Sequence, residues 1–290
     1  MPHLGAHLSA AGGSWRAVDA AVAAGCEALQ LFLRPPTRWA AAPLGAAEAV
    51  RFRAAATGAG LGGLCFAHAP YLLNPASEDP VLRERSVAVL ADELRRAGAL
   101  GLAGVVLHPG SAGGGDRGEA EARCRAALAE ALDRAGSSAA RLLLEGQAGS
   151  GGQLGRTPTE LARLVESAGS GGRVGVCLDS AHLWGAGFDL LGDGWERVLG
   201  ELGEHWRMQA PQLFHGNDTE VELGSRRDRH APPGEGRLGR AFFSRMLTDE
   251  RCAELPVVLE IPPGDGNALV KKALVRLRRW QKRAAARPDA

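Results

Sequence analysis

The chain has 290 residues, 45% of them hydrophobic, so it can bury a large core either as one α/β barrel or as two smaller domains. A formal net charge of +1 excludes attraction of nucleic acid by a global positive field and leaves only a local basic patch for that task. Five cysteines without a C-x-x-C pair, no leader pattern, and no apolar stretch near the roughly 20 residues that span a bilayer predict a cytoplasmic protein with reduced thiols.

Short apolar runs predict eight strands, at residues 4–8, 28–33, 64–68, 105–108, 142–145, 174–179, 212–215 and 257–260. Segments with helical periodicity lie between them, for example at 15–24, 81–99, 119–135, 158–168 and 268–283. Continuously apolar strands that alternate with helices predict an α/β fold, a single (β/α)8 TIM-barrel domain over residues 1–290. We expect the basic segment 276–287, including a C-terminal tail from about residue 282, to fray into solvent.

Metal-competent side chains stand at six successive ends of the predicted strands. They are His68, His108, Glu145, Asp179, His215 and Glu260. Functional groups of such barrels gather at the carboxyl ends of the strands, so these six should share one face of the barrel. A single His or carboxylate at a strand end could merely cap a helix or bind a loop amide. Six in succession argue against that interpretation.

Three further candidate ligands follow the sixth and seventh predicted strands. His182 comes about one helical turn after Asp179, and Asp228 and His230 form an Asp-x-His pair in a loop. Mixed imidazole and carboxylate ligation suits Zn²⁺, with Mn²⁺ or Fe²⁺ as alternatives where carboxylates dominate. Five imidazoles among the nine candidates favour zinc.

The other three histidines have no ligand spacing. They are His3, His7 and His205. We expect His205 on the surface of a helix. His7, which ends the first predicted strand, could touch a substrate or hold its own loop, and we favour the second role.

Motifs around these residues resemble the endonuclease IV family. They are G-A-H-L-S at 5–9, H-P-G-S at 108–111, D-S-A-H-L-W-G-A-G-F-D at 179–189, H-G-N-D at 215–218, G-S-R-R-D-R-H at 224–230 and G-E-G at 234–236. The run at 179–189 is highly specific. The similarity extends from Gly5 to about Gln281, and the order and spacing of the motifs are kept.

The resemblance implies a DNA repair enzyme that cuts duplex DNA 5′ of apurinic/apyrimidinic sites, leaving a 3′-hydroxyl and a 5′-deoxyribose phosphate. It also implies three Zn²⁺ per chain, with Mn²⁺ as an alternative at one or more sites. By resemblance, the three ligand sets are His68, His108 and Glu145; Glu145, Asp179, His215 and Glu260; and His182, Asp228 and His230. Neighbouring ions lower the pKa of a shared water, so Glu145 would act as the catalytic bridge and Glu260 would orient the nucleophile.

The predicted DNA-contact residues depart from the family pattern. After the second strand, where the family usually has Asn and Lys or Gln, the chain reads Arg34-Pro-Pro-Thr-Arg38-Trp39. The two arginines keep a phosphate-binding capacity, so we predict that this loop contacts DNA. The alternative is a Pro-rich turn with Trp39 packed inward. Tyr71 matches the family's DNA-facing residue, with a buried, hydrogen-bonded tyrosine as the alternative.

Further departures adjoin the candidate ligands. Gly146 and Gln147 replace a usual Asn-Thr, Ile261 replaces a Thr, and Thr219 with Glu220 replaces a Ser-Lys. These changes alter the support of both catalytic carboxylates and add negative charge near the site, which would weaken DNA binding or lower activity.

Two other functions fit part of the ligand set. A sugar isomerase or epimerase of the same barrel superfamily would use one or two Mn²⁺ ions at Glu145, Asp179, His215 and Glu260, without needing the other five ligands. A barrel that binds metal or damaged DNA without cleaving it is the second alternative. Metal content separates them, because about three zinc ions per chain would indicate repair.

We expect a monomer, since nothing in the implied mechanism requires a partner chain.

Overall fold

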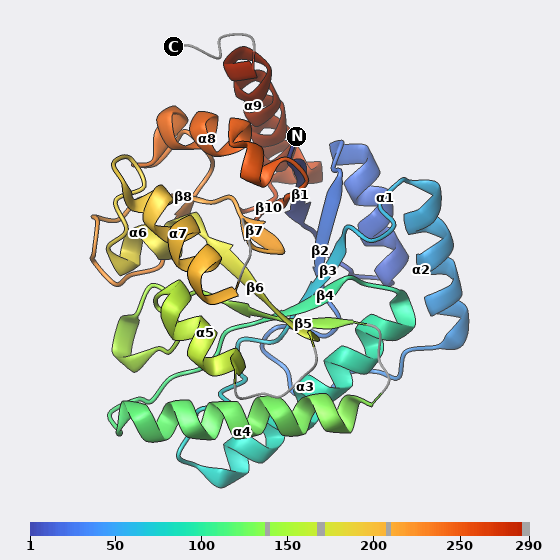
Figure 1. The fold of residues 1–290 in the computed structure, drawn as a ribbon. Coiled ribbons are helices and arrows are strands. Elements are labelled where there is room, and N and C mark those ends of the chain that lie inside the picture. The colour runs from blue at the N-terminus through green and yellow to red at the C-terminus, as the bar shows by residue number, and fades with distance from the viewer. Residues whose placement is uncertain (137–139, 167–171, 207–209, 286–290) are drawn as a thin grey trace.

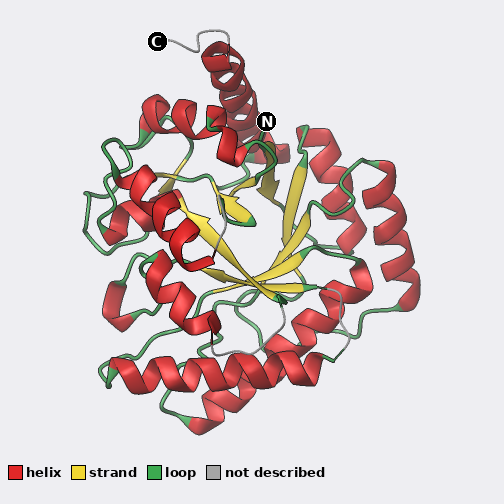
Figure 2. Cartoon of the chain, viewed as in Figure 1, coloured by secondary structure: helices red, strands yellow, loops and turns green. Residues whose placement is uncertain are grey.

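Eight parallel strands close into a barrel in the computed structural model, and helices surround it (Figures 1 and 2). The structure describes residues 1–136, 140–166, 172–206 and 210–285. Around the barrel the strands follow the order β1-β10-β7-β6-β5-β4-β3-β2, so each strand lies beside its neighbours in the chain. The expected (β/α)8 TIM barrel is therefore confirmed.

The barrel strands lie within about one residue of the predicted limits at most ends. They are β1 (His3–His7), β2 (Ala28–Phe32), β3 (Cys65–His68), β4 (Gly104–Leu107), β5 (Arg141–Glu145), β6 (Val174–Asp179), β7 (Leu213–His215) and β10 (Pro256–Leu259). A separate antiparallel pair, β8 (Asp218–Thr219) with β9 (His230–Ala231), was not predicted. This pairing returns the chain after β7 toward the barrel mouth and carries His230 with it.

The helices that the sequence predicted are α1 (Ser14–Ala24), α3 (Pro80–Leu100), α4 (Arg117–Ala135), α5 (Pro158–Glu166) and α9 (Ala268–Ala285). The last two residues of the range predicted for α5, 167 and 168, lie outside the described residues. The other helices are α2 (Ala46–Gly58), α6 (Ser180–Ala186), α7 (Gly194–Trp206) and α8 (Gly239–Thr248). Among the described residues, no helix has both the length and the apolar character needed to cross a membrane.

The prediction that the chain frays from Arg276 onward is wrong. Helix α9 continues to Ala285, so the first residues of the tail expected from about residue 282 are still helical. Leu277 and Trp280 are buried against the molecule, and the Arg276 guanidinium donates to the Pro233 carbonyl. Burial of one apolar face therefore holds a helix whose sequence reads as a basic tail.

Side chains inside the barrel form two layers of opposite chemistry. The lower layer is apolar and consists of Ala28, Phe66, Val106, Leu143, Cys177, Leu213 and Val258. Side chains alternate along a strand, so the residue two positions further on points inward again, and there it is polar. The polar layer consists of Gln30, His68, His108, Glu145, Asp179, His215 and Glu260. The candidate site thus lies next to a layer of buried apolar side chains that fills the barrel below it.

Close packing of the first two strands completes the barrel. A Cβ atom at Gly5 would lie 1.8 Å from the Ala28 carbonyl oxygen, so this position of β1 accepts only glycine. Two residues later, His7 joins the polar layer and pairs in register with Gln30 of β2.

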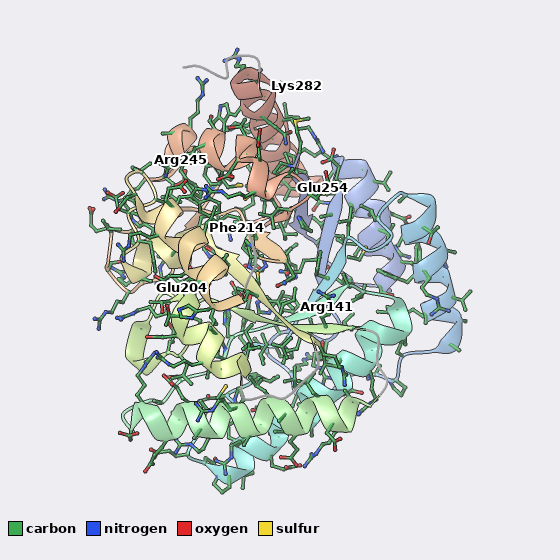
Figure 3. All side chains as sticks on the ribbon, in the orientation of Figure 1. Arg141, Glu204, Phe214, Arg245, Glu254 and Lys282 are labelled. Carbon is green, nitrogen blue, oxygen red and sulfur yellow. The ribbon has the colours of Figure 1, made fainter. Side chains whose placement is uncertain are left out.

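Residues between the inward positions fix the strands against the helices. Phe214, one residue before His215, points outward, and its ring centroid lies 5.6 Å from that of Trp195 in α7. Figure 3 shows Phe214 within the body of the molecule, whereas Glu204 and Lys282 lie on the outer helices. Outward burial of Phe214 holds the neighbouring His215 side chain toward the barrel axis.

Candidate metal centre

The nine candidate ligands gather at the carboxyl end of the barrel. Eight of them form three groups: His68, His108 and Glu145; Glu145, Asp179, His215 and Glu260; and Asp179, His182 and His230. Within each group the potential ligand atoms lie within 4.8 Å of one another. The sets that the resemblance assigns to the first and second ions are therefore brought together by the fold. We call them the first, second and third metal groups.

Asp228 completes the third group. One of its carboxylate oxygens lies 3.2 Å from His182 Nε2, and the other lies 3.0 Å from His230 Nε2. The predicted trio is thus assembled, and Asp179 joins it from the second group. Asp228 is half exposed, so this group forms the solvent-facing side of the centre.

Glu145 lies between the first and second groups and is fully buried. Its Oε2 is 3.1 Å from His68 Nε2 and 3.0 Å from His108 Nε2. Its Oε1 is 3.0 Å from His215 Nδ1. Each oxygen therefore faces a different group, which is the geometry that a bridging carboxylate requires.

Four of the imidazoles turn one ring nitrogen away from the centre, toward an oxygen acceptor. The pairs are His68 Nδ1 with Ala69 O (2.7 Å), His182 Nδ1 with Gly146 O (2.8 Å), His215 Nε2 with Gln30 Oε1 (2.9 Å) and His230 Nδ1 with Glu260 O (3.2 Å). Carbonyl and amide oxygens only accept, so these nitrogens carry the proton. The other nitrogen of each ring then faces the groups and can bind an ion once the ring is neutral, as in metal-ligating histidines.

His230 gives an independent test of metal fit. Its Nε2 is buried and forms no hydrogen bond to any described residue, although a carboxylate oxygen of Asp228 lies 3.0 Å away. A nitrogen and an oxygen that are close but not aligned for a hydrogen bond suit two ligands of one ion. The nitrogen and oxygen donors of the three groups also match what Zn²⁺ accepts.

Buried acids and bases shift one another's pKa values within the centre. Burial raises the pKa of Glu145, but His215 and His108 outweigh it and hold that pKa well below its ordinary value. Burial lowers the pKa of His230, but Asp179 and Asp228 outweigh it and raise that pKa to about 9. The pKa of His182 is also raised, by carboxylates that outweigh burial. Protons therefore occupy sites that cations would otherwise fill.

Asp179 both begins a helix and faces the centre. Its Oδ1 accepts hydrogen bonds from the backbone amides of Ala181 (2.6 Å) and His182 (3.0 Å), which caps α6. Its Oδ2 lies 3.5 Å from His230 Nε2 and accepts a 2.6 Å bond from Asn217 Nδ2. Oδ1 of Asp179 therefore caps the helix, whereas Oδ2 faces the centre and is available as a ligand.

Two buried amides, Gln30 and Asn217, bind candidate ligands and were not predicted from the sequence. Asn217 Oδ1 also accepts from the backbone N–H of Glu260 (2.8 Å). The signal for Gln30 was a lone polar residue inside the apolar run A-L-Q-L-F, and Asn217 stands in the H-G-N-D motif.

The remaining histidines lie outside the three groups. His7 Nδ1 is 3.0 Å from Gln30 Nε2, so His7 is tied to the polar layer rather than to its own loop alone. His3 pairs with Glu254 at 3.3 Å. His205 is exposed in α7, as predicted.

The family departures near the ligands have identifiable contacts. Gly146 binds His182 through its backbone carbonyl, which any residue provides. The Gln147 side chain is buried, with its amide between Gly110 and Leu154 carbonyls. Ile261 is buried, Thr219 Oγ1 donates to the Arg229 carbonyl, and Glu220 is exposed. The departures thus leave the ligand positions intact.

Arg34 is not available to a phosphate in this structure, which contradicts its predicted role as a surface contact. Its guanidinium donates to Glu93 (2.5 Å), Asp92 (2.6 Å) and the Trp39 carbonyl (2.6 Å). Its side chain is 3% exposed, and Glu93 is fully buried. A buried carboxylate without a counter-ion is strongly destabilising, so Arg34 is retained as the partner of Glu93 and is not free to bind a phosphate.

Of the other predicted DNA contacts, Arg38 and Tyr71 lie at the surface, whereas Trp39 is packed. Arg38 is exposed, and no ion pair to it is found within the described parts of the chain. Trp39 is partly buried against the core, and Arg85 stacks over its ring at 4.2 Å, which favours the packed alternative for Trp39. Tyr71 is 57% exposed, and its ring stacks 6.0 Å from that of His108. The buried alternative for Tyr71 is therefore wrong.

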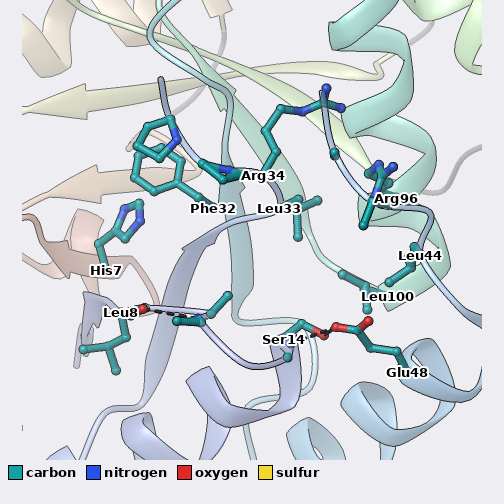
Figure 4. A pocket seen from close by; sticks show the side chains of 18 of the residues that line it. His7, Leu8, Ser14, Phe32, Leu33, Arg34, Leu44, Glu48, Arg96 and Leu100 are labelled. Carbon is teal, nitrogen blue, oxygen red and sulfur yellow. Dashed lines mark hydrogen bonds between the residues drawn. The ribbon is translucent and has the colours of Figure 1, made fainter. Parts of the chain in front are cut away.

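A cavity of about 720 Å³ adjoins the second metal group. His7, Tyr71 and Glu260 are among its lining residues, and segment 33–44 forms one wall. Figure 4 shows that Ser14 and Glu48 also line the cavity, where Glu48 accepts a hydrogen bond from the Ser14 hydroxyl (2.9 Å). The polar layer is therefore open on this side to a bound molecule.

Comparison with known proteins decides the family. The model of the xylose isomerase-like TIM barrel family matches residues 18–280. "Probable endonuclease 4" of Oleidesulfovibrio alaskensis is 46% identical over 264 residues, which are 91% of this chain and 90% of that protein. "Probable endonuclease 4" of Nitratidesulfovibrio vulgaris (strain DP4) is 41% identical over 280 residues, 96% of this chain and 99% of that protein. The chain belongs to the endonuclease IV family.

Solved structures agree with this assignment. Endonuclease IV from Thermus thermophilus superposes with a TM-score of 0.85 at 35% identity, covering 97% of this chain and 100% of that chain. A D-tagatose 3-epimerase-like protein superposes with a TM-score of 0.72 at 17% identity, and this likeness shows the fold alone. Family membership makes the chain a metal-using deoxyribonuclease, and it confirms the predicted family.

Proposed function

We propose that this enzyme hydrolyses the phosphodiester 5′ of abasic sites in duplex DNA, leaving a 3′-hydroxyl and a 5′-deoxyribose phosphate, in base excision repair. The observation that carries the proposal is the pair of Glu145 oxygens, each facing a separate group of candidate ligands. Endonuclease IV relatives over nearly the whole chain support it.

Three zinc ions would be held by the three metal groups. The five imidazoles favour zinc, and Mn²⁺ is the alternative in the second group, where three carboxylates meet one imidazole. When bound, the ions would supply Lewis acidity and an activated water for attack on phosphorus. Four carboxylates cannot neutralise three divalent cations, so the loaded centre would attract a phosphodiester.

The protein's own groups would bind and orient the substrate. Glu145 would hold the first two groups at a fixed separation, and Glu260, which lines the cavity, would orient the attacking water. Tyr71 and Arg38 are exposed and would contact DNA, Tyr71 through its ring and Arg38 through phosphate. Arg34 would not be part of this interface, because its guanidinium is bound internally.

We also propose a cytoplasmic monomer with one barrel domain. All nine candidate ligands come from one chain, so the centre is complete without a partner. The cytoplasmic location rests on the proposed DNA substrate.

Incision of a duplex oligonucleotide carrying one tetrahydrofuran abasic analogue tests the function. This analogue cannot be cut by β-elimination, so a break 5′ of the lesion with a 3′-hydroxyl end would indicate hydrolysis. The activity should disappear after prolonged chelation and return with zinc. Zinc-loaded protein that leaves the duplex intact would contradict the proposal, and sugar epimerisation with Mn²⁺ would then be the next assay.

A further inference from the structure

Gln30 stands in the same layer of the barrel as the candidate ligands, but it belongs to none of the three metal groups. It is the inward residue of β2 in the polar layer, and it is fully buried. Burial of an amide is costly unless its donors and its acceptor are satisfied, so a polar residue within an apolar strand calls for specific partners.

The partners of Gln30 belong to the polar layer. Its Nε2 donates to Glu260 Oε1 (2.6 Å) and lies 3.0 Å from His7 Nδ1. Its Oε1 lies 2.9 Å from His215 Nε2. The reverse orientation of the amide would place two oxygens 2.6 Å apart at Glu260. Nε2 must therefore face Glu260, and Oε1 must face His215.

The fixed amide determines how both ligands present themselves. An amide oxygen only accepts, so His215 Nε2 must carry a proton, and Nδ1 is the nitrogen that faces the second group and can give up its own proton to an ion. There Nδ1 lies 3.0 Å from Glu145 Oε1 and 3.3 Å from Glu260 Oε2. The amide hydrogen bond also occupies Glu260 Oε1, which leaves Oε2 for the centre.

We propose that Gln30 is the positioning residue of the second metal group: it selects the metal-binding tautomer of His215 and makes Glu260 a ligand through one oxygen. This inference rests on the proposed occupation of that group by a metal ion. His7 supports the arrangement by accepting the second amide hydrogen. Its ring lies against Phe32, with the centroids 4.3 Å apart, and both side chains line the cavity (Figure 4).

The experiment is a titration of metal-free protein with Co²⁺, followed by absorption spectroscopy. Gln30→Leu keeps a side chain of similar size and removes all three polar contacts. We expect the affinity for one of the three equivalents to fall about 10- to 100-fold, with an altered Co²⁺ spectrum for that equivalent. The other two equivalents should bind as in the wild type, which a general loss of stability would not produce.

Two further variants keep the test decisive. Gln212→Leu is the matched control, because Gln212 accepts from the Val176 amide (2.6 Å) outside the polar layer, and its titration should match the wild type. Gln30→Glu decides the matter if Gln30→Leu does not fold. It retains the size but sets an acceptor against Glu260, so it should weaken the same equivalent at least as much.

The outcomes separate this inference from the proposed function. Wild-type affinity and spectrum for all three equivalents in Gln30→Leu, or in Gln30→Glu if the first does not fold, would overturn the positioning role and leave the proposed function standing. Wild-type protein that binds fewer than three equivalents would instead overturn the three-ion proposal and, with it, the role of Gln30.

Discussion

Glu145 is the residue on which the most candidate ligands converge. Nitrogens of His68, His108 and His215 lie 3.0 to 3.1 Å from its two oxygens. His182 Nδ1, which hydrogen-bonds the Gly146 carbonyl, also lies 3.3 Å from Glu145 Oε1. A carboxylate with four imidazole neighbours can serve two ions at once only if both oxygens are charged acceptors. Replacing one oxygen by an amide nitrogen removes that capacity without changing the shape of the side chain.

Glu145→Gln should therefore lower incision of the tetrahydrofuran duplex by more than about 100-fold, because the loss of a shared ligand exceeds the usual effect of a residue that only supports ligands. Bound zinc, measured by elemental analysis, should fall as well. Glu204→Gln, in the exposed part of α7, is the control and should behave as the wild type. Retained activity of the Glu145 variant would remove the bridging role.

Proton competition predicts a pH dependence of metal binding. Burial alone lowers the pKa of His230, but Asp179 and Asp228 outweigh it and raise this pKa to about 9 in the metal-free protein. The protonated ring has no lone pair for an ion at neutral pH, and this competition fades as the pH rises through about 9.

Zinc affinity should accordingly increase from about pH 7 to about pH 9 in competition titrations with a chelator, after correction for the chelator's own protonation. Zinc binding at about pH 8 should also release protons, which measurements in two buffers of different ionisation enthalpy detect. A pH-independent affinity with no proton release would show that the imidazoles are already neutral.

The element that departs most from expectation is segment 33–44, which follows β2. Two guanidinium groups hydrogen-bond its backbone: Arg34 donates to the Trp39 carbonyl, and Arg96 donates to the Ala42 carbonyl (2.8 Å). Asp92 binds both guanidinium groups at 2.6 Å. The loop is therefore a supported wall of the cavity, with Arg38 as its exposed cation.

Arg38→Ala should weaken duplex binding and reduce the salt slope of log K by about 1, because one phosphate contact is lost. Binding isotherms over a series of salt concentrations measure this slope, and zinc content should not change. Arg16→Ala, at an exposed position of α1, provides a charge-matched control. An unchanged slope in Arg38→Ala would exclude Arg38 from the DNA interface.

Arg34→Met should act on stability instead. It leaves the Glu93 carboxylate buried without its counter-ion, so the free energy of unfolding in urea should fall by about 3–5 kcal/mol. Adding Glu93→Met should recover much of this loss, since the unpaired charge is then gone. A reduced salt slope with unchanged stability would restore Arg34 to the DNA interface.

At the scale of the whole molecule, the barrel collects ligands from β3, β4, β5, β6, β7 and β10 and from the segments that follow β6 and β7. Ions bound at these positions link distant parts of the chain in the folded state only. Each ion at a free concentration of about 100 times its Kd would stabilise that state by about 2.7 kcal/mol.

Chelation should therefore lower the Tm by more than about 5 °C while the circular dichroism at about 25 °C stays unchanged. Zinc should restore the Tm, whereas Mg²⁺ should not, because imidazole-rich sites do not suit it. A Tm that is unaffected by the verified removal of metal would mean that the ions contribute nothing to stability.

The sequence by itself determined the barrel and the nine candidate ligands, because both depend on local order. Strand and helix patterns alternate along the chain, and parallel strands bring their carboxyl ends to one face. His68, Glu145 and His215 could thus be assigned to one centre before any contact was known. The tertiary structure decided what depends on distant partners. Arg34 is buried because Asp92 and Glu93 approach it from α3, and Gln30 acquires its role only beside Glu260, 230 residues away in the chain. Such pairings leave no periodic signal in a single sequence, since they follow from which elements pack together.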